Sequence, residues 1–114
     1  MQRGRGSLIM ISSFSGLPGQ AQNADAAYCA EKGAVISYRL AIAKELKPHG
    51  VAANVLLPGL TRTTITQGYE HWETHTAIMN PEDPVPAAIF LAQQNASGVT
   101  AELVRAREYL AQTR

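Results

Sequence analysis

Two mostly apolar runs, at residues 7–11 and 51–57, constrain the fold of this chain more than any other feature. Continuous apolar character, without alternation of polar and apolar residues, predicts strands that are buried on both faces, as in a parallel sheet. Between the two runs we expect one long helix, which begins at Asn23–Asp25 and ends at Lys47, before the helix-breaking Pro48. Strand, long helix and strand in this order predict a βαβ crossover, which is almost always right-handed.

The remainder of the chain predicts shorter elements. Pro81, with Asn80 as its N-cap, favours the start of a second helix that ends between residues 95 and 98. Residues 99–104 predict a last strand, and residues 105–113 predict a short polar tail. The fold class is therefore α/β, with about three strands and flanking helices.

Composition limits the partners that such a chain can have. It has 114 residues, of which 46% are hydrophobic and 17% charged, and a net charge of +1, which fits one globular domain. We expect no nucleic-acid partner, because the basic residues form no dense face, and no membrane span, because no apolar run approaches roughly 20 residues. The single cysteine, Cys29, excludes an internal disulfide and fits a reducing, cytoplasmic setting.

Tyr28 and Lys32 are four residues apart in the predicted helix, so they share one face of it. A free tyrosine titrates near pH ~10 and exchanges protons poorly at neutral pH. A neighbouring ammonium group favours the phenolate form and so makes proton transfer easier near neutrality. The pair therefore indicates a general acid or base, if a serine hydroxyl can hold a substrate oxygen beside it.

Further polar residues are predicted at the same place in the fold. Ser12 and Ser13 directly follow the first predicted strand, and residues 58–63 directly follow the second. Ligands of open parallel sheets bind beyond the carboxyl ends of the strands, and the start of the crossover helix lies at that edge. We therefore expect these residues to converge with Tyr28 and Lys32 on one edge of the sheet.

Three sequence blocks, in order, carry a resemblance to a known family. They are GSLIMISSFSG at residues 6–16, Tyr28-x-x-x-Lys32, and NVLLPG at residues 54–59 with Thr63 after it. Together these blocks resemble the short-chain dehydrogenase/reductase family, and segments between residues 81 and 100 resemble its last helix and strand. The resemblance implies a Rossmann-type fold, a doubly wound parallel sheet, of which this chain is the C-terminal half.

The resemblance also implies a reaction and a role for each catalytic residue. Ser13 would hydrogen-bond the substrate oxygen, and Tyr28 would be the general acid or base. Lys32 would favour the phenolate and bind the ribose hydroxyls beside the nicotinamide. Hydride would pass between the cofactor and a carbonyl or alcohol carbon, while the protein supplies position and the proton.

The cofactor implied by the resemblance is NAD or NADP. The backbone at Pro58 and Gly59 would contact the nicotinamide, Thr63 would help to hold its carboxamide or the phosphates, and Thr61 belongs to the same turn. The substrate would be a small-molecule carbonyl or alcohol. Members of the family often assemble through their long helices, so we expect the full-length parent to be a homo-oligomer.

Departures from the family pattern narrow these expectations. No Gly-x-Gly turn between a strand and a helix occurs in the chain, and the family's upstream catalytic asparagine is absent. We therefore expect residues 1–114 to form a single partial domain without the dinucleotide-binding half. Ala101 stands where the family usually has glycine. The alternative to an oxidoreductase function is that the chain is a truncated, non-catalytic fragment or an association module.

The functional interpretation of several other residues has a plainer alternative. Tyr28 alone fits an ordinary half-buried tyrosine with Lys32 as a surface partner. Ser12 fits a loop hydrogen-bonding residue better than a catalyst, and Asn54 fits a structural residue that ties its side chain to nearby backbone. Cys29 fits a small packing residue.

The segment from His71 to His75 offers two histidines at helical i, i+4 spacing. A zinc site is conceivable there, but the acid between them, Glu73, is misplaced for the His-Glu-x-x-His arrangement. We therefore expect no metal. In the resembling family this region is the substrate loop, so we expect Tyr69, Trp72 and Met79 to line a pocket or lid.

Overall fold

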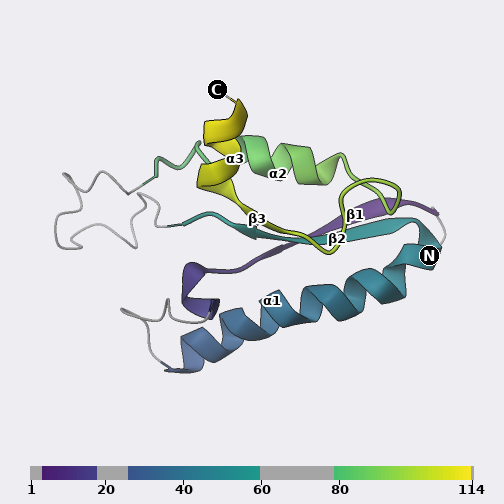
Figure 1. Cartoon of the computed structure of the whole chain (residues 1–114), viewed down its shortest axis with the longest axis horizontal. Helices are drawn as coiled ribbons and strands as arrows, with labels where there is room; N and C mark the ends of the chain where they lie inside the picture. The colour runs from purple at the N-terminus through teal and green to yellow at the C-terminus, as the bar shows by residue number, and fades with distance from the viewer. Residues whose placement is uncertain (1–3, 18–25, 60–78, 114) are drawn as a thin grey trace, which may run out of the picture.

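A computed structural model describes residues 4–17, 26–59 and 79–113, and shows a three-stranded parallel sheet with helices on both faces (Figure 1). The neighbouring strands pair in parallel, in the order β1-β2-β3. The strands are β1 (Gly6–Ile11), β2 (Val51–Leu57) and β3 (Leu103–Arg105). The predicted α/β fold with about three strands is confirmed in this part of the chain.

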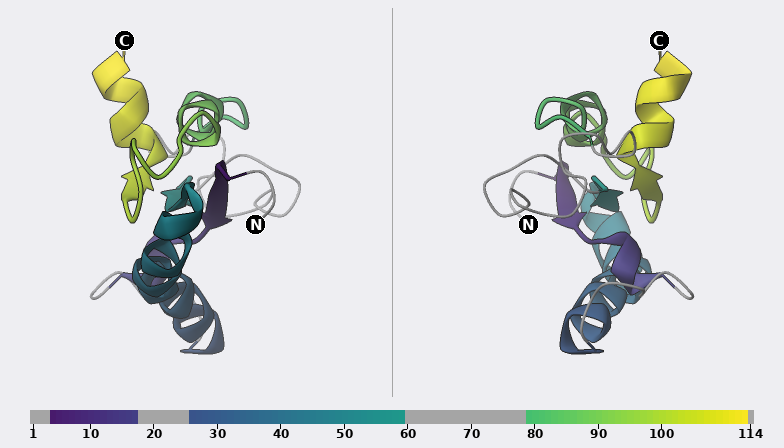
Figure 2. Two further views of the ribbon diagram at one scale, coloured as in Figure 1. Left: turned by 90° about the vertical axis from the view of Figure 1, so that its right-hand side faces the viewer. Right: turned by 90° about the vertical axis from the view of Figure 1, so that its left-hand side faces the viewer.

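The helices form two layers around the sheet. The long helix lies against one face of the sheet and the short helices lie against the other (Figure 2). The long helix is α1 (Ala26–Leu46); the short ones are α2 (Val85–Ala92) and α3 (Ala106–Thr113). Two 3-10 turns, η1 (Phe14–Gly16) and η2 (Lys47–His49), follow β1 and α1. Helix α1 connects the parallel strands β1 and β2, which confirms the predicted βαβ crossover.

Strand β2 forms the centre of the sheet, and all seven of its residues are buried. Its continuous apolar sequence follows from this position, since both of its faces are covered and both of its edges are paired. The core cluster on the α2 and α3 side comprises Leu56, Met79, Ala87, Leu91 and Ala106. Burial of this surface is the main force that holds the two short helices on the sheet.

Strand β1 is less covered than its sequence predicts. It is an edge strand of the described sheet, and its Leu8 and Ile11 side chains are exposed. The expectation of a strand buried on both faces therefore holds for β2 and is wrong for β1 in the described residues. The reason is its position, because an edge strand has a neighbour on one side only.

Helix α1 ends as its sequence predicts. Its last residue is Leu46, and the chain then tightens into η2 around Pro48. Gly50 closes the turn with a left-handed φ of 76°, and its N–H donates a hydrogen bond to the Lys47 carbonyl. Along α1 only Ala43 is fully buried, whereas Tyr38 and Leu40 are exposed, so part of its apolar surface has no cover among the described residues.

The start of α2 differs from the prediction. The helix begins at Val85, after a turn, and not at Pro81 with an Asn80 cap. The Asn80 N–H donates to the Asp83 carboxylate at 2.8 Å, and the Asp83 N–H donates to the Asn80 carbonyl at 3.0 Å. Pro84 and Pro86 lack the N–H that a helix interior needs, so they fit only the cap and the first turn of α2.

The end of α2 also comes earlier, at Ala92. The Gln94 side chain donates from Nε2 to the Phe90 carbonyl at 3.0 Å and accepts from the Val99 N–H at 2.9 Å. These two hydrogen bonds turn the chain back toward the sheet, because they satisfy a carbonyl of the last helical turn and an amide of the next segment with one side chain.

The last strand is shorter than predicted, because side chains replace part of its ladder. Asn54, fully buried in β2, donates to the Val99 carbonyl and accepts from the Glu102 N–H, each at 3.0 Å. The Thr100 hydroxyl accepts from the Ala53 N–H at 3.0 Å. These bonds confirm the structural role predicted for Asn54, and they leave residues 103–105 as the paired strand.

The predicted polar tail is wrong, because residues 106–113 form helix α3. Ala106 is buried at its start, and the ring of Tyr109 packs against Phe90 of α2 with a centroid separation of 5.2 Å. The apolar contacts of a few residues in a mostly polar segment are enough to dock it, since tertiary packing stabilises short helices more than propensity does.

Ala101 adopts a left-handed backbone conformation, with a φ of 63°. Its N–H donates to the Ala53 carbonyl at 2.8 Å, and its carbonyl accepts from Nε of Arg39 at 3.2 Å. A Cβ atom in this conformation costs about 1–2 kcal/mol, and glycine gives back about 0.5–1 kcal/mol of that in entropy. We expect Ala101→Gly to raise the free energy of unfolding by about 0.5–1 kcal/mol in urea denaturation.

A matched control for this substitution is Ala30→Gly, at an exposed position of α1 with ordinary helical geometry. It is expected to lower the free energy of unfolding by about 1 kcal/mol. If Ala101→Gly lowers the free energy of unfolding as much as Ala30→Gly does, the left-handed conformation of Ala101 stores no strain.

Candidate active site

The carboxyl ends of β1 and β2 lie at one edge of the sheet, on the left of Figure 1, where α1 also begins. Strand β1 leads into Ser12, Ser13 and η1 at this edge, and β2 leads into Pro58 and Gly59. The structure therefore brings the described members of the predicted site to the same end of the fold. Thr61, Thr63, Tyr69, Trp72 and the His71–His75 segment lie outside the described residues.

Tyr28 and Lys32 are neighbours on the surface of α1. The Nζ atom of Lys32 lies 5.7 Å from the centroid of the Tyr28 ring. Tyr28 is 40% exposed, whereas the Lys32 side chain is only 21% exposed. A molecule at this edge could reach the tyrosine ring, and the ammonium group lies close enough to interact with the ring as a cation.

A carboxylate also lies near the ammonium group. Oε1 of Glu31 is 3.8 Å from Nζ of Lys32, and its side chain is 68% exposed. An ion pair at such an exposed position contributes little to stability and holds its partners weakly. Lys32 can therefore exchange this contact for a hydrogen bond to a ligand at little cost.

Ser12 is buried and holds two elements together. It is 5% exposed, its hydroxyl donates to the Lys32 carbonyl at 2.7 Å, and its N–H donates to the Leu56 carbonyl at 3.1 Å. The prediction that Ser12 is a hydrogen-bonding residue is confirmed. No sequence pattern indicates that its partner is the backbone of Lys32, since the two residues are far apart along the chain.

Ser13 begins the turn that follows β1. Its carbonyl accepts a hydrogen bond from the Gly16 N–H at 3.0 Å, which closes η1, and the residue is half-buried. The turn places Ser13 directly after Ser12, whose side chain contacts α1. Its predicted role toward a substrate oxygen stays a prediction.

Two glycines let η1 and α1 approach closely. A Cβ atom on Gly16 would lie 2.5 Å from the Lys32 carbonyl carbon and 2.7 Å from the Gly33 nitrogen. A Cβ atom on Gly33 would lie 3.3 Å from the Gly16 oxygen. Both glycines are therefore packing positions beside Lys32. For Gly33, a glycine inside the predicted helix was the available sequence signal.

Gly59 follows β2 with a left-handed φ of 85°. A Cβ atom there would lie 3.4 Å from Cε2 of Phe14 and 3.5 Å from Sδ of Met79. Met79 is 3% exposed and belongs to the core cluster, so the expectation that it lines a substrate pocket or lid is wrong. Its flexible thioether side chain fills the space beneath the turn.

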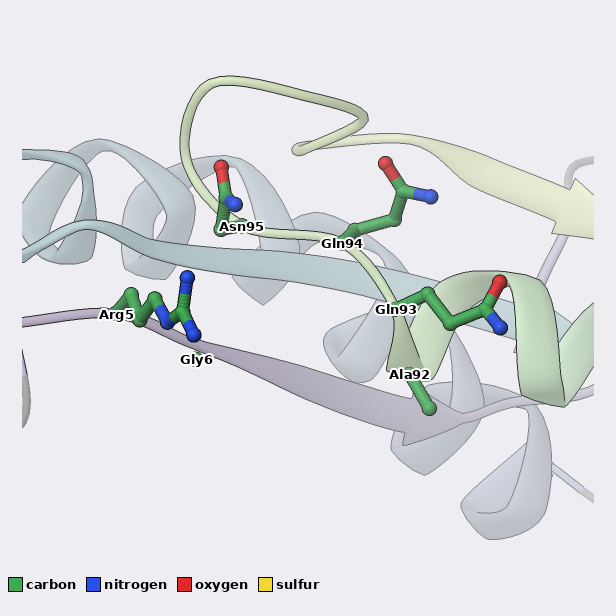
Figure 3. A pocket seen from close by; sticks show the side chains of 6 residues that line it. All are labelled: Arg5, Gly6, Ala92, Gln93, Gln94 and Asn95. Atoms are coloured by element: carbon green, nitrogen blue, oxygen red, sulfur yellow. The ribbon is translucent and has the colours of Figure 1, made fainter.

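A cleft of about 610 Å³ lies elsewhere, at the amino end of β1 (Figure 3). Its lining comprises Arg5, Gly6, Ala92, Gln93, Gln94 and Asn95. Ser12 and Ser13 are at the opposite end of β1, so this cleft and the candidate site are separate. Within residues 4–17, 26–59 and 79–113 no group of three histidine, cysteine or acidic residues could hold a metal, and no helix is long and apolar enough to cross a membrane.

Comparison with known proteins decides the family. Residues 1–106 match the family model described as Enoyl-(Acyl carrier protein) reductase. The chain belongs to the short-chain dehydrogenase/reductase family. A curated member, the 3-oxoacyl-[acyl-carrier-protein] reductase FabG of Rickettsia prowazekii, is 28% identical over 110 residues, which are 90% of this chain and 45% of the relative. The chain thus spans less than half the length of this short-chain dehydrogenase/reductase.

Solved short-chain dehydrogenase/reductase structures have the same fold. A short chain dehydrogenase from Mycobacterium paratuberculosis bound to NAD is 28% identical, with a TM-score of 0.72 over 91% of this chain and 45% of that one. A gluconate 5-dehydrogenase from Burkholderia cenocepacia in complex with NADP and tartrate is 26% identical, with a TM-score of 0.73 over 91% and 44%. The described sheet and helices are therefore part of a Rossmann-type fold.

Proposed function

We propose that this chain supplies the proton-transfer residues of an NAD(P)-dependent oxidoreductase that acts on a carbonyl or alcohol. The observation that carries this proposal is the Lys32 ammonium group 5.7 Å from the ring of an accessible Tyr28, at the carboxyl edge of a parallel sheet. Membership of the short-chain dehydrogenase/reductase family supports it, because the relatives named above are oxidoreductases by name.

In the proposed reaction, Tyr28 gives its proton to the carbonyl oxygen as the alcohol forms, and takes it back in the reverse direction. Ser13 hydrogen-bonds the same oxygen and orients it toward the phenol. Lys32 favours the phenolate that remains after the proton has left. The nicotinamide, when bound, supplies or accepts the hydride.

Part of the cofactor fits the residues present. An ammonium group with three donors suits ribose hydroxyls, and Lys32 is held by its partly buried position at the edge of the site. Pro58 and Gly59 follow β2 at the carboxyl edge of the sheet, and the left-handed φ of Gly59 bends the backbone there. We propose that NAD or NADP binds here with its nicotinamide end against the backbone of Pro58 and Gly59, and that Thr61 and Thr63 add contacts.

The substrate proposal is broader. The Rickettsia relative is named a 3-oxoacyl reductase and the Burkholderia structure a gluconate dehydrogenase, so both names imply chemistry at a carbonyl or hydroxyl carbon. A 3-oxoacyl thioester and gluconate are therefore the two test substrates. We propose a cytoplasmic setting, in which the single cysteine of the chain, Cys29, stays reduced.

The purified 114-residue chain is expected to show no measurable NAD(P)-dependent turnover. Its sequence has no Gly-x-Gly turn between a strand and a helix to bind the cofactor phosphates, since Gly4 and Gly6 lead into strand β1. Each lost hydrogen bond to a charged group costs about 1.5–3 kcal/mol. Two such bonds alone correspond to about 10²–10⁴ in affinity. Turnover is measured by absorbance at the wavelength of the reduced nicotinamide, with each of the two cofactors and each of the two test substrates.

The positive counterpart is a chimaera in which the chain replaces the matching segment of the Rickettsia reductase. We expect the chimaera to turn over at least one of the test substrates, whereas turnover by the 114-residue chain alone would contradict the predicted loss of phosphate binding.

The second candidate function is a non-catalytic association module. The observation that favours it is exposed apolar surface on β1 and α1, at Leu8, Ile11, Tyr38 and Leu40. Such a surface also fits the homo-oligomer that we propose for the full-length parent. A chimaera without turnover, together with self-association of the chain in sedimentation, would favour this candidate over the oxidoreductase.

A further inference from the structure

We propose that Ser12 is a positioning residue, which sets the place of Lys32 and Tyr28 relative to the ends of both long strands. The inference deepens the proposed function and rests on it for its catalytic meaning. The hydrogen bonds on which the inference depends are observed in the structure, whether or not the proposed function is correct.

Ser12 connects three parts of the candidate site at once. Its own position is the residue after β1, and its N–H donates to the Leu56 carbonyl near the end of β2 at 3.1 Å. Its hydroxyl donates to the Lys32 carbonyl at 2.7 Å. The strand ends that carry Ser13 and Gly59 are therefore linked through one side chain to the helical turn that carries the ammonium group.

Burial makes this link strong. Ser12 and Asn54 are the two buried polar side chains in the described part of the chain, and both have all their buried polar atoms hydrogen-bonded. A carbonyl inside a helix already accepts from the amide four residues later and has a second lone pair for the serine hydroxyl. Loss of the hydroxyl would remove the link between Ser12 and α1, and the low exposure of Ser12, 5%, leaves little room for water to replace it.

The glycines beside Lys32 leave room for the link. Gly16 and Gly33 let the backbones of η1 and α1 approach closely. A Cβ atom on Gly16 would lie 2.5–2.8 Å from backbone atoms of Lys32 and Gly33. Close packing alone lets one element slide along the other, whereas a directed hydrogen bond fixes the register. Displacement of a catalytic group by about 1 Å can cost about a hundredfold in rate.

Ser7 provides a matched control within the same strand. Its hydroxyl also donates to a helix carbonyl, that of Leu91 in α2, at 2.5 Å. Ser7→Ala thus removes the same kind of hydrogen bond from the other end of β1, away from Tyr28 and Lys32. A purely structural role for such bonds predicts the same outcome for both serines.

The first test uses the 114-residue chain and amide hydrogen exchange. Ser12→Ala is expected to speed the exchange of the amides around Lys32 by about tenfold or more, and Ser7→Ala is expected to leave them unchanged. Ser12→Cys, which keeps the size and weakens the donor, is the second variant and is expected to lie between them. Unchanged exchange in both Ser12 variants would overturn the inference, whatever the turnover.

The second test uses the chimaera with the Rickettsia reductase. Ser12→Ala is expected to lower kcat by about tenfold or more with KM for the substrate nearly unchanged, while Ser7→Ala keeps kcat within about twofold. Ser12→Thr restores the hydroxyl and is expected to recover most of the loss. Equal kcat losses in Ser12→Ala and Ser7→Ala would overturn the positioning role; loss of the Tyr28 requirement would instead overturn the proposed function.

Discussion

Replacement of Tyr28 by phenylalanine in the chimaera is expected to lower kcat by about 10²–10⁴-fold, the usual contribution of a positioned acid or base. The substitution removes one oxygen atom from a side chain that is 40% exposed, so it leaves the packing of α1 nearly unchanged. The free energy of unfolding is expected to stay within about 0.5 kcal/mol. A loss of kcat without a loss of stability would identify the phenol oxygen as the group that carries the proton.

Tyr38→Phe is the matched control for this experiment. Tyr38 belongs to the same helix and is 53% exposed, and it has no predicted part in the reaction. Its variant is expected to keep kcat within about twofold. Near-normal turnover of the Tyr28→Phe chimaera would reject Tyr28 as the proton donor, and a similar loss in both variants would point to a general effect on the helix.

The second large effect is expected from Gly16→Ala. The new Cβ atom would lie 2.5 Å from the Lys32 carbonyl carbon and 2.8 Å from its oxygen, and neither atom can move without the helix. Overpacking of this kind costs about 1–3 kcal/mol in the free energy of unfolding. Because the clash pushes the Lys32 turn away from Ser12 and Ser13, we also expect kcat of the chimaera to fall by about tenfold or more.

Gly6→Ala is the control for this clash. A Cβ atom on Gly6 would meet only Cγ2 of Val51, at 3.8 Å, which is an ordinary van der Waals distance. We expect its free energy of unfolding to stay within about 0.5 kcal/mol of the wild type and its kcat to be unchanged. Urea denaturation and steady-state kinetics measure both glycine variants, and a Gly16→Ala chain as stable and active as Gly6→Ala would contradict the close packing of η1 on α1.

Sequence patterns predicted the elements that depend on local chemistry. The apolar run that became β2 is buried throughout, and the helix before it ends at Leu46 where the Pro48 and Gly50 pair predicts a stop. The neighbouring positions of Tyr28 and Lys32 follow from the helical repeat alone. Each of these features is set by residues that are close together in the chain, so a local pattern contains the information.

The errors lie where one local signal competes with another, or where a distant residue outweighs local propensity. Asn80 has the chemistry of a helix cap, but its turn is organised by Asp83 and by a proline that delays α2. The segment predicted as a polar tail forms α3, because Tyr109 packs against the ring of Phe90. Asp83 and Pro84 are close to Asn80 in the sequence, but the prediction gives more weight to the cap chemistry of Asn80. Phe90 belongs to another helix and is not part of the local pattern of the tail.

Hydrophobic periodicity and the helical repeat are local, so they were enough to predict the class of fold, the βαβ order and the spacing of the phenol and the ammonium group. Contacts between distant parts of the chain make β1 an exposed edge, place Met79 in the core and give Ala101 its left-handed conformation, and no local pattern predicted these three features. The tertiary structure also decided that the Ser12 hydroxyl holds the Lys32 carbonyl. These outcomes depend on which surfaces meet after the chain has folded, and packing at close range selects them.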